Sequence, residues 1–78
     1  MELETIFADF NNTDICGRVR LSVTGATQNI KRKNIDMIEG KAVMLDDGDG
    51  LKIIGILKFS KEENIWVAEI DRERFINY

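Results

Sequence analysis

The clearest pattern in the chain is an alternation of apolar and polar residues with a period of two. Within residues 15–23, every second residue from Val19 onward is apolar, which predicts a strand with one buried face. In residues 51–59 the odd positions are apolar or glycine, while Ile54 and Ile56 make the opposite face partly apolar as well. A strand with two apolar faces is expected in the centre of a sheet or beneath a cover.

The same pattern and shorter apolar runs predict five strands in all. Aspartates and glycines at residues 46–50 indicate a hairpin turn, and residues 60–64 have the length and polarity of a second one. A third turn is expected at residues 11–14. The predicted strands cover residues 3–10, 15–23, 42–45, 51–59 and 65–71, the last two forming a hairpin and the last three a meander.

Residues 24–34 break the strand pattern. Thr27 is a residue type that caps helices, so one or two helical turns are expected from there through Lys31. Three isoleucines are then expected to cover an open end of the sheet. Residues 72–78 predict either a helical turn packed on the sheet, where Phe75 and Tyr78 would cover Trp66, or a frayed end. The three isoleucines are Ile30, Ile35 and Ile38.

Seventy-eight residues, 44% of them hydrophobic, are enough for one small domain spanning residues 1–78. Five short antiparallel strands in this length must close into a barrel or leave exposed edges. The predicted fold is therefore all-β: a small five-stranded antiparallel SH3-like barrel with one short helical turn. An OB-type barrel is the alternative, although it usually needs more residues and a longer helix.

A family resemblance points the same way. Residues 39–45, the strand containing Gly55, and residues 66–68 resemble the strands and tight turns of SH3-like barrels over about half of the chain. That resemblance implies an architecture used by binding modules in many unrelated settings. The whole chain also resembles small uncharacterised bacterial proteins, which implies no activity.

Composition excludes several kinds of chemistry. The chain has no His and a single cysteine, Cys16, so a disulfide within the chain is impossible and a Cys/His metal site is not expected. Without His, Cys16 has no base to activate it, and we expect it to be a structural, half-buried residue at the start of a strand. The acidic turn at residues 46–50 fails the calcium-loop pattern, because Leu57 stands where the twelfth-position Glu belongs. We therefore expect a protein that is not an enzyme and holds no metal or cofactor.

The chain also lacks targeting signals. The first ten positions contain Glu2, Glu4 and Asp9 where a signal peptide has basic residues, and no apolar run approaches the roughly 20 residues of a membrane span. A cytoplasmic location without a membrane partner is expected.

Binding to another protein, or to a second copy of the chain, is the leading functional hypothesis. Trp66 lies on the face of its strand opposite Ile65 and Val67, so a small barrel must leave one of these two faces partly exposed. Exposed aromatic side chains are frequent anchors in interfaces. Recognition would use the apolar side of the last two strands or an open strand edge. The candidate partner-binding residues are Trp66, Ile54, Ile56 and Met44.

Nucleic-acid binding is the competing hypothesis. Five basic residues could form one patch on a chain whose net charge is −3, and phosphate contacts would make its affinity depend steeply on salt. The negative net charge favours a protein partner over a nucleic acid. The candidate nucleic-acid-binding residues are Lys31, Arg32, Lys33, Arg18 and Arg20.

Overall fold

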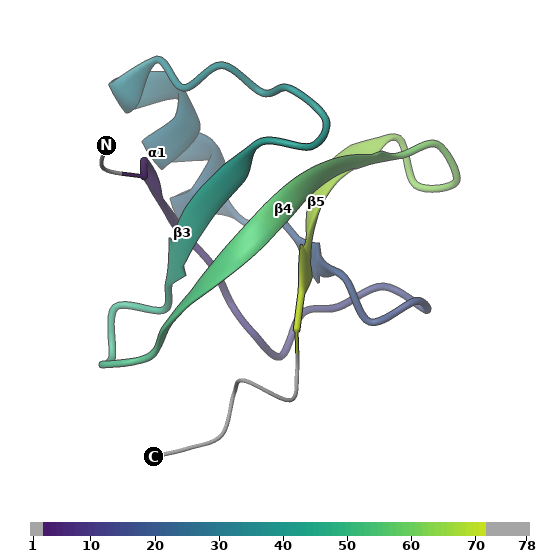
Figure 1. The fold of residues 1–78 in the computed structure, drawn as a ribbon, viewed down its shortest axis with the longest axis horizontal. Helices are drawn as coiled ribbons and strands as arrows, with labels where there is room; N and C mark the ends of the chain where they lie inside the picture. The colour runs from purple at the N-terminus through teal and green to yellow at the C-terminus, as the bar shows by residue number, and fades with distance from the viewer. Residues whose placement is uncertain (1–2, 72–78) are drawn as a thin grey trace.

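The computed structural model describes residues 3–71, which form five strands and one helix (Figure 1). Along the sheet the strands are ordered β1-β3-β4-β5-β2. Both expectations for residues 72–78, the helical turn over Trp66 and the frayed end, fall outside the described residues. The elements are β1 (Thr5–Phe7), β2 (Val19–Arg20), α1 (Thr24–Lys33), β3 (Ala42–Asp46), β4 (Lys52–Ser60) and β5 (Ile65–Ile70).

The hairpin of β4 and β5 confirms the strongest sequence pattern. Its antiparallel register runs from Ser60 opposite Ile65 to Gly55 opposite Ile70. The odd residues of β4 share the inner face, as their alternation predicts, and Leu57 there is fully buried opposite Ala68. At Gly55 an added Cβ would lie 2.8 Å from Leu45 Cδ1, so only glycine fits between β3 and β5. Local alternation and turn chemistry were sufficient to predict this part of the fold.

The sheet is mixed, so the prediction of an all-antiparallel barrel is wrong in this respect. β1 pairs in parallel with β3, Thr5 opposite Met44 and Phe7 opposite Asp46, whereas the other pairings are antiparallel. A parallel pair requires a long connection, and here the connection contains β2 and α1. The resulting fold is a strongly twisted β-rich half-barrel with one short helix (Figure 1).

The helix begins earlier and is longer than the sequence predicts. Val23 occupies the N-cap position with extended backbone and no side-chain cap, so Thr27 is not the capping residue. Instead Thr27 Oγ1 donates to the carbonyl of Thr24 within the helix. The helix ends at Asn34 in the left-handed conformation (φ 55°). Packing of buried Ala26 against the core, rather than a capping signal, therefore places the helix.

The core lies on the inner face of the sheet beneath α1. Ile35 is buried and Ile30 packs against the core, as expected, but Ile38 is 58% exposed and covers nothing. Ile38 lies in the loop between α1 and β3, outside the regular elements. The buried core residues are Ile6, Ala8, Val19, Leu21, Ala26, Ile35, Val43, Leu45, Leu57 and Ala68.

One stripe of α1 covers the free edge of β1. Gly25, Asn29 and Lys33 are spaced four residues apart and therefore share a face of the helix. Gly25 lets the helix approach closely, because an added Cβ would lie 2.6 Å from Phe7 Cδ2. The Phe7 amide donates to Asn29 Oδ1 (2.7 Å), and Lys33 Nζ donates to the Thr5 carbonyl (2.9 Å). Side chains of the helix thus take the place of a neighbouring strand.

Backbone of the N-terminal loop covers the free edge of β2. The Arg20 amide donates to the Asn12 carbonyl, and the Asp14 amide donates to the Arg18 carbonyl, both at 2.9 Å. Thr13 also forms an isolated bridge with Val19. In both outermost strands, outward hydrogen-bonding groups are therefore engaged by other parts of the chain.

The contact between Asn29 and β1 is testable by substitution. We expect Asn29→Ala to lower the free energy of unfolding by about 1 kcal/mol, because it leaves the partly buried Phe7 amide without an acceptor. Asn29→Asp retains an acceptor for the Phe7 amide and should lower the free energy of unfolding clearly less. Urea denaturation of the two variants measures the difference, and equal losses would contradict the role of the hydrogen bond.

Candidate functional site

The first half of β4 is open on one side. β5 ends at Ile70 opposite Gly55, so Lys52, Ile53 and Ile54 pair with β3 but have no strand partner on their other side within residues 3–71. At this overhang an open groove of about 630 Å³ passes around the strand. We call it the β4 groove, and its lining residues are Met44, Lys52, Ile53, Ile54, Ile56, Glu69, Ile70 and Asp71.

The β4 groove is apolar in the middle and charged at its margins. Met44 and Ile54 are directly opposite each other on the outer face, and Ile56 is opposite Glu69. Ile54 is 52% exposed, a large fraction for an isoleucine in a sheet. At one margin Lys52 Nζ lies 3.9 Å from Asp46 Oδ2. Apolar residues bordered by both signs of charge are typical of a surface that binds polypeptide.

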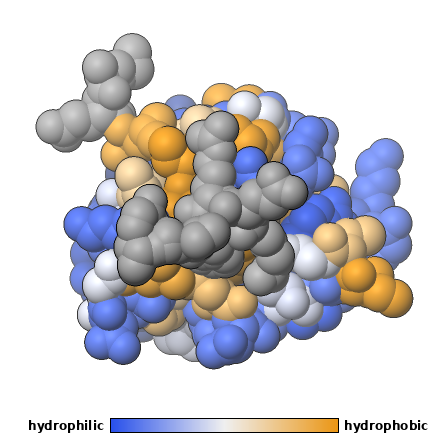
Figure 2. All heavy atoms as spheres, turned by 60° about the horizontal axis from the view of Figure 1, so that its bottom comes forward, coloured by the Kyte–Doolittle hydropathy of each residue, from blue (hydrophilic) through white to orange (hydrophobic). Residues whose placement is uncertain are grey.

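Hydrophobic surface is distributed unevenly over the molecule. On the face that Figure 2 brings forward, hydrophobic side chains gather in patches between hydrophilic ones. Three of the four predicted partner-binding residues, Met44, Ile54 and Ile56, lie together in the β4 groove. Ile53 and Ile70 also line the groove, and the sequence pattern did not single them out as binding residues.

Trp66, the fourth predicted residue, lies elsewhere. It is opposite Phe59 on the inner face, and their rings meet edge to face with centroids 5.3 Å apart. Trp66 is half-buried and packs against the core, whereas Val67 on the other face is fully buried. Trp66 lines a separate groove beside α1 and does not share a surface with Ile54.

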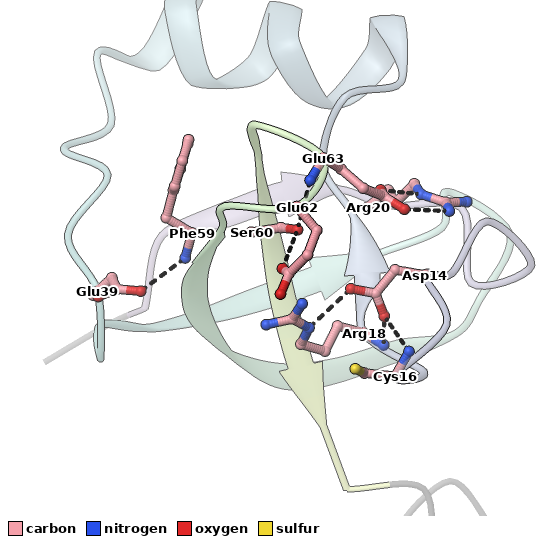
Figure 3. A network of polar contacts seen from close by, with 9 residues as sticks. All are labelled: Asp14, Cys16, Arg18, Arg20, Glu39, Phe59, Ser60, Glu62 and Glu63. Atoms are coloured by element: carbon pink, nitrogen blue, oxygen red, sulfur yellow. Dashed lines mark hydrogen bonds and ion pairs between the residues drawn. The ribbon is translucent and has the colours of Figure 1, made fainter.

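Arg18 is held in a network with Asp14 (Figure 3). Asp14 is only 7% exposed, and its Oδ2 accepts from Arg18 Nε at 2.8 Å. The backbone amides of Cys16 and Arg18 both donate to Asp14 Oδ1. Burial alone would raise the pKa of Asp14, but the hydrogen bonds and charge of Arg18 and the amide of Cys16 together lower it below 3.8.

Arg20 is held by an acid from a distant turn. Its Nε and Nη2 donate to the two carboxylate oxygens of Glu63 at 2.7 and 2.8 Å (Figure 3). Its Nη1 donates to Asn12 Oδ1. The Arg20 guanidinium lowers the pKa of Glu63, while the Glu63 carboxylate raises that of Arg20. These 43 residues of separation left no sequence signal for the pair. Both candidate arginines are therefore engaged within the chain.

The three remaining basic candidates form the last turn of α1 and do not point the same way. Successive helical residues are rotated by about 100°, so Lys31, Arg32 and Lys33 diverge although they are adjacent in sequence. Lys33 contacts β1, whereas Lys31 lines the groove of Trp66. The structure shows acid partners for Arg18 and Arg20 and separates the directions of the helical cations.

The acidic turn is shaped by its own aspartates, and Cys16 lies in a different turn. Asp46 Oδ1 accepts from the amide of Gly48, and Asp47 Oδ1 accepts from two amides of its own turn, so these carboxylates shape the hairpin. Cys16 is exposed in a turn, which corrects its expected half-buried position at the start of a strand. The shorter β2, which begins only at Val19, is the reason.

In comparisons with known proteins, no family model, curated protein or solved structure matches this chain. Within residues 3–71, no helix is long and apolar enough to span a membrane.

The charge on Asp14 should stabilise the fold. Because its folded-state pKa lies below 3.8, the carboxylate stabilises the protein fully above that pH, and this contribution is lost as pH falls through the lower folded-state value. We expect Asp14→Asn to lower the free energy of unfolding at pH 7 by about 1–3 kcal/mol.

Urea denaturation at several pH values measures this effect. The difference between wild type and Asp14→Asn should shrink below pH 3.8. Asp49→Asn, in the exposed hairpin turn, is the control and should change stability by no more than about 0.5 kcal/mol. A difference for Asp14→Asn that is constant down to pH 2 would contradict the assignment.

Proposed function

We propose that this protein is a non-enzymatic interaction module whose β4 groove binds an extended segment of a partner protein. The observation that carries the proposal is the overhang of β4. There Lys52–Ile54 has no strand partner on one side within the described residues, and Ile54 is 52% exposed. An added strand could hydrogen-bond to this edge while its alternate side chains contact Ile54 on one face and Ile53 on the other.

The closed outer edges support this assignment. Strand addition needs unpaired backbone groups, and α1 and residues 12–14 already engage outward groups of β1 and β2. Among residues 3–71, this favours the first half of β4 as the position for strand addition. Lys52 and Glu69 at the margins would select the charge of the partner segment.

The inferred fold and cellular location fit the proposal. We infer an SH3-like barrel, with an OB-type barrel as the alternative, and a cytoplasmic protein of bacterial type. Binding of nucleic acid through Lys31, Arg32, Lys33, Arg18 and Arg20 is the less favoured function. The reason is that Asp14 and Glu63 already neutralise two of those five cations.

Substitution of Ile54 tests the proposal. Ile54→Lys places a charge in the middle of the β4 groove and should reduce recovery of the partner from lysate at least about tenfold, since buried interface anchors contribute 1.4 kcal/mol or more. Ile38→Lys is the matched control, because Ile38 is also a strongly exposed isoleucine (58%) but lies in the loop after the helix and does not line the β4 groove. Thermal unfolding should show that both variants fold.

Other occupants of the β4 groove give different results. Self-association would appear as a dimer by analytical ultracentrifugation that Ile54→Lys abolishes. Occupation by residues 72–78 would make Ile54→Lys and a chain ending at Asp71 equally destabilised. Either result, or unchanged partner recovery by Ile54→Lys, would overturn binding of a separate partner at this groove.

A further inference from the structure

A second groove lies on the inner side of the molecule, between α1 and the start of β5. It has a volume of about 290 Å³ and an almost entirely apolar lining. Ile65 and Trp66 at the start of β5 line it together with Ile30 of the helix. We call it the Trp66 groove, and its lining residues are Leu21, Ser22, Thr27, Ile30, Lys31, Met37, Ile65 and Trp66.

The charge at this groove is positive. Lys31 is the only charged residue in its lining, and Arg32 follows it on the exposed side of the helix. Within residues 3–71, neither of these two side chains forms an ion pair. They differ in this from Arg18 and Arg20, whose charges Asp14 and Glu63 neutralise. A free cation at the rim of an apolar groove is suited to an anion attached to an apolar group.

We propose that the Trp66 groove binds an acidic peptide segment of a partner protein through one large apolar side chain. That side chain lies between Trp66 and Ile30, and a neighbouring carboxylate of the segment pairs with Lys31. The sequence placed Trp66 and Lys31 in two different hypotheses, one for protein and one for nucleic acid. The structure brings both residues to one groove.

The shape and charge favour a peptide over other anionic ligands. The groove is shallow and open to solvent, so it admits a single side chain while the main chain of the ligand stays outside beside the helix. A long acyl chain requires a deeper enclosed cavity. The net charge of −3 does not oppose an acidic ligand here, because charges beyond about 10 Å are screened at 0.1 M salt.

This site is independent of the β4 groove. The two grooves share no lining residue. Loss of binding at Ile54 therefore does not predict loss of binding at Trp66, and failure of one proposal is distinguishable from failure of the other.

Fluorescence of the intact chain tests the proposal directly, because Trp66 is the only tryptophan. The probe is an acetylated, amidated pentapeptide with Leu between two pairs of Glu. We expect a saturable blue shift of the emission as Leu excludes water from the indole. The affinity should fall as salt is raised from 0.05 to 0.5 M, values chosen to bracket a Debye length of about 10 Å. Peptides with Ala in place of Leu, or Lys in place of Glu, should give no saturable shift.

Two variants locate the binding. Lys31→Glu should lower the affinity for the acidic probe at least about threefold, as expected for reversal of an exposed ion pair. Thr27→Met fills the groove and should lower the probe affinity to a similar extent. Thr24→Met is the control, since Thr24 is also exposed on α1 but does not line the groove, and it should leave the affinity unchanged. Ile54→Lys should leave the probe affinity unchanged.

Three outcomes would overturn the proposal. The first is an emission spectrum that the acidic probe does not change. The second is equal binding of the Lys-containing peptide. The third is saturable binding of decanoate, or of an oligonucleotide, in the absence of peptide binding, which would assign the groove to a different ligand class.

Discussion

The fold depends on how a sheet that does not close into a barrel covers its edges. β1 and β2 are only three and two residues long, and neither meets another strand on its outer side. An amide without an acceptor costs about as much as a lost hydrogen bond. The chain provides acceptors from side chains and loops: Asn29 for Phe7, the Asn12 carbonyl for Arg20, and Glu39 for Phe59. A helix face, a loop and one carboxylate together replace the missing strands.

The same constraint explains where interaction surface remains. β4 is the longest strand and extends past the end of β5, so its first residues have a partner only in β3 within the described part of the chain. Apolar side chains on both faces of this overhang form the β4 groove. The ion pairs have the opposite effect on the cations: Asp14 and Glu63 engage Arg18 and Arg20 to hold the loops that cover β2. Apolar side chains therefore remain exposed at β4, whereas Arg18 and Arg20 are engaged within the chain.

Local features of the sequence predicted local structure and missed what distant segments contribute. The β4–β5 hairpin follows from alternation and turn residues, and Ile54, Ile56 and Met44 follow from the apolar outer face of the same strands. The parallel pairing of β1 with β3 has no local signature, because it depends on a connection of more than thirty residues. The start of α1 was missed because Val23 offers no capping side chain. The position of Trp66 beside Lys31 required the packing of the helix on the sheet.

Native-state hydrogen exchange tests the closure of the edges most directly. The amides of Phe7 and Phe59 point away from neighbouring strands and donate to side chains, Asn29 Oδ1 and Glu39 Oε2. If these side chains cover the edges, both amides exchange far more slowly than unstructured peptide, with protection approaching that of central residues such as Leu57. Exchange of both amides at the rate of unstructured peptide would contradict the account.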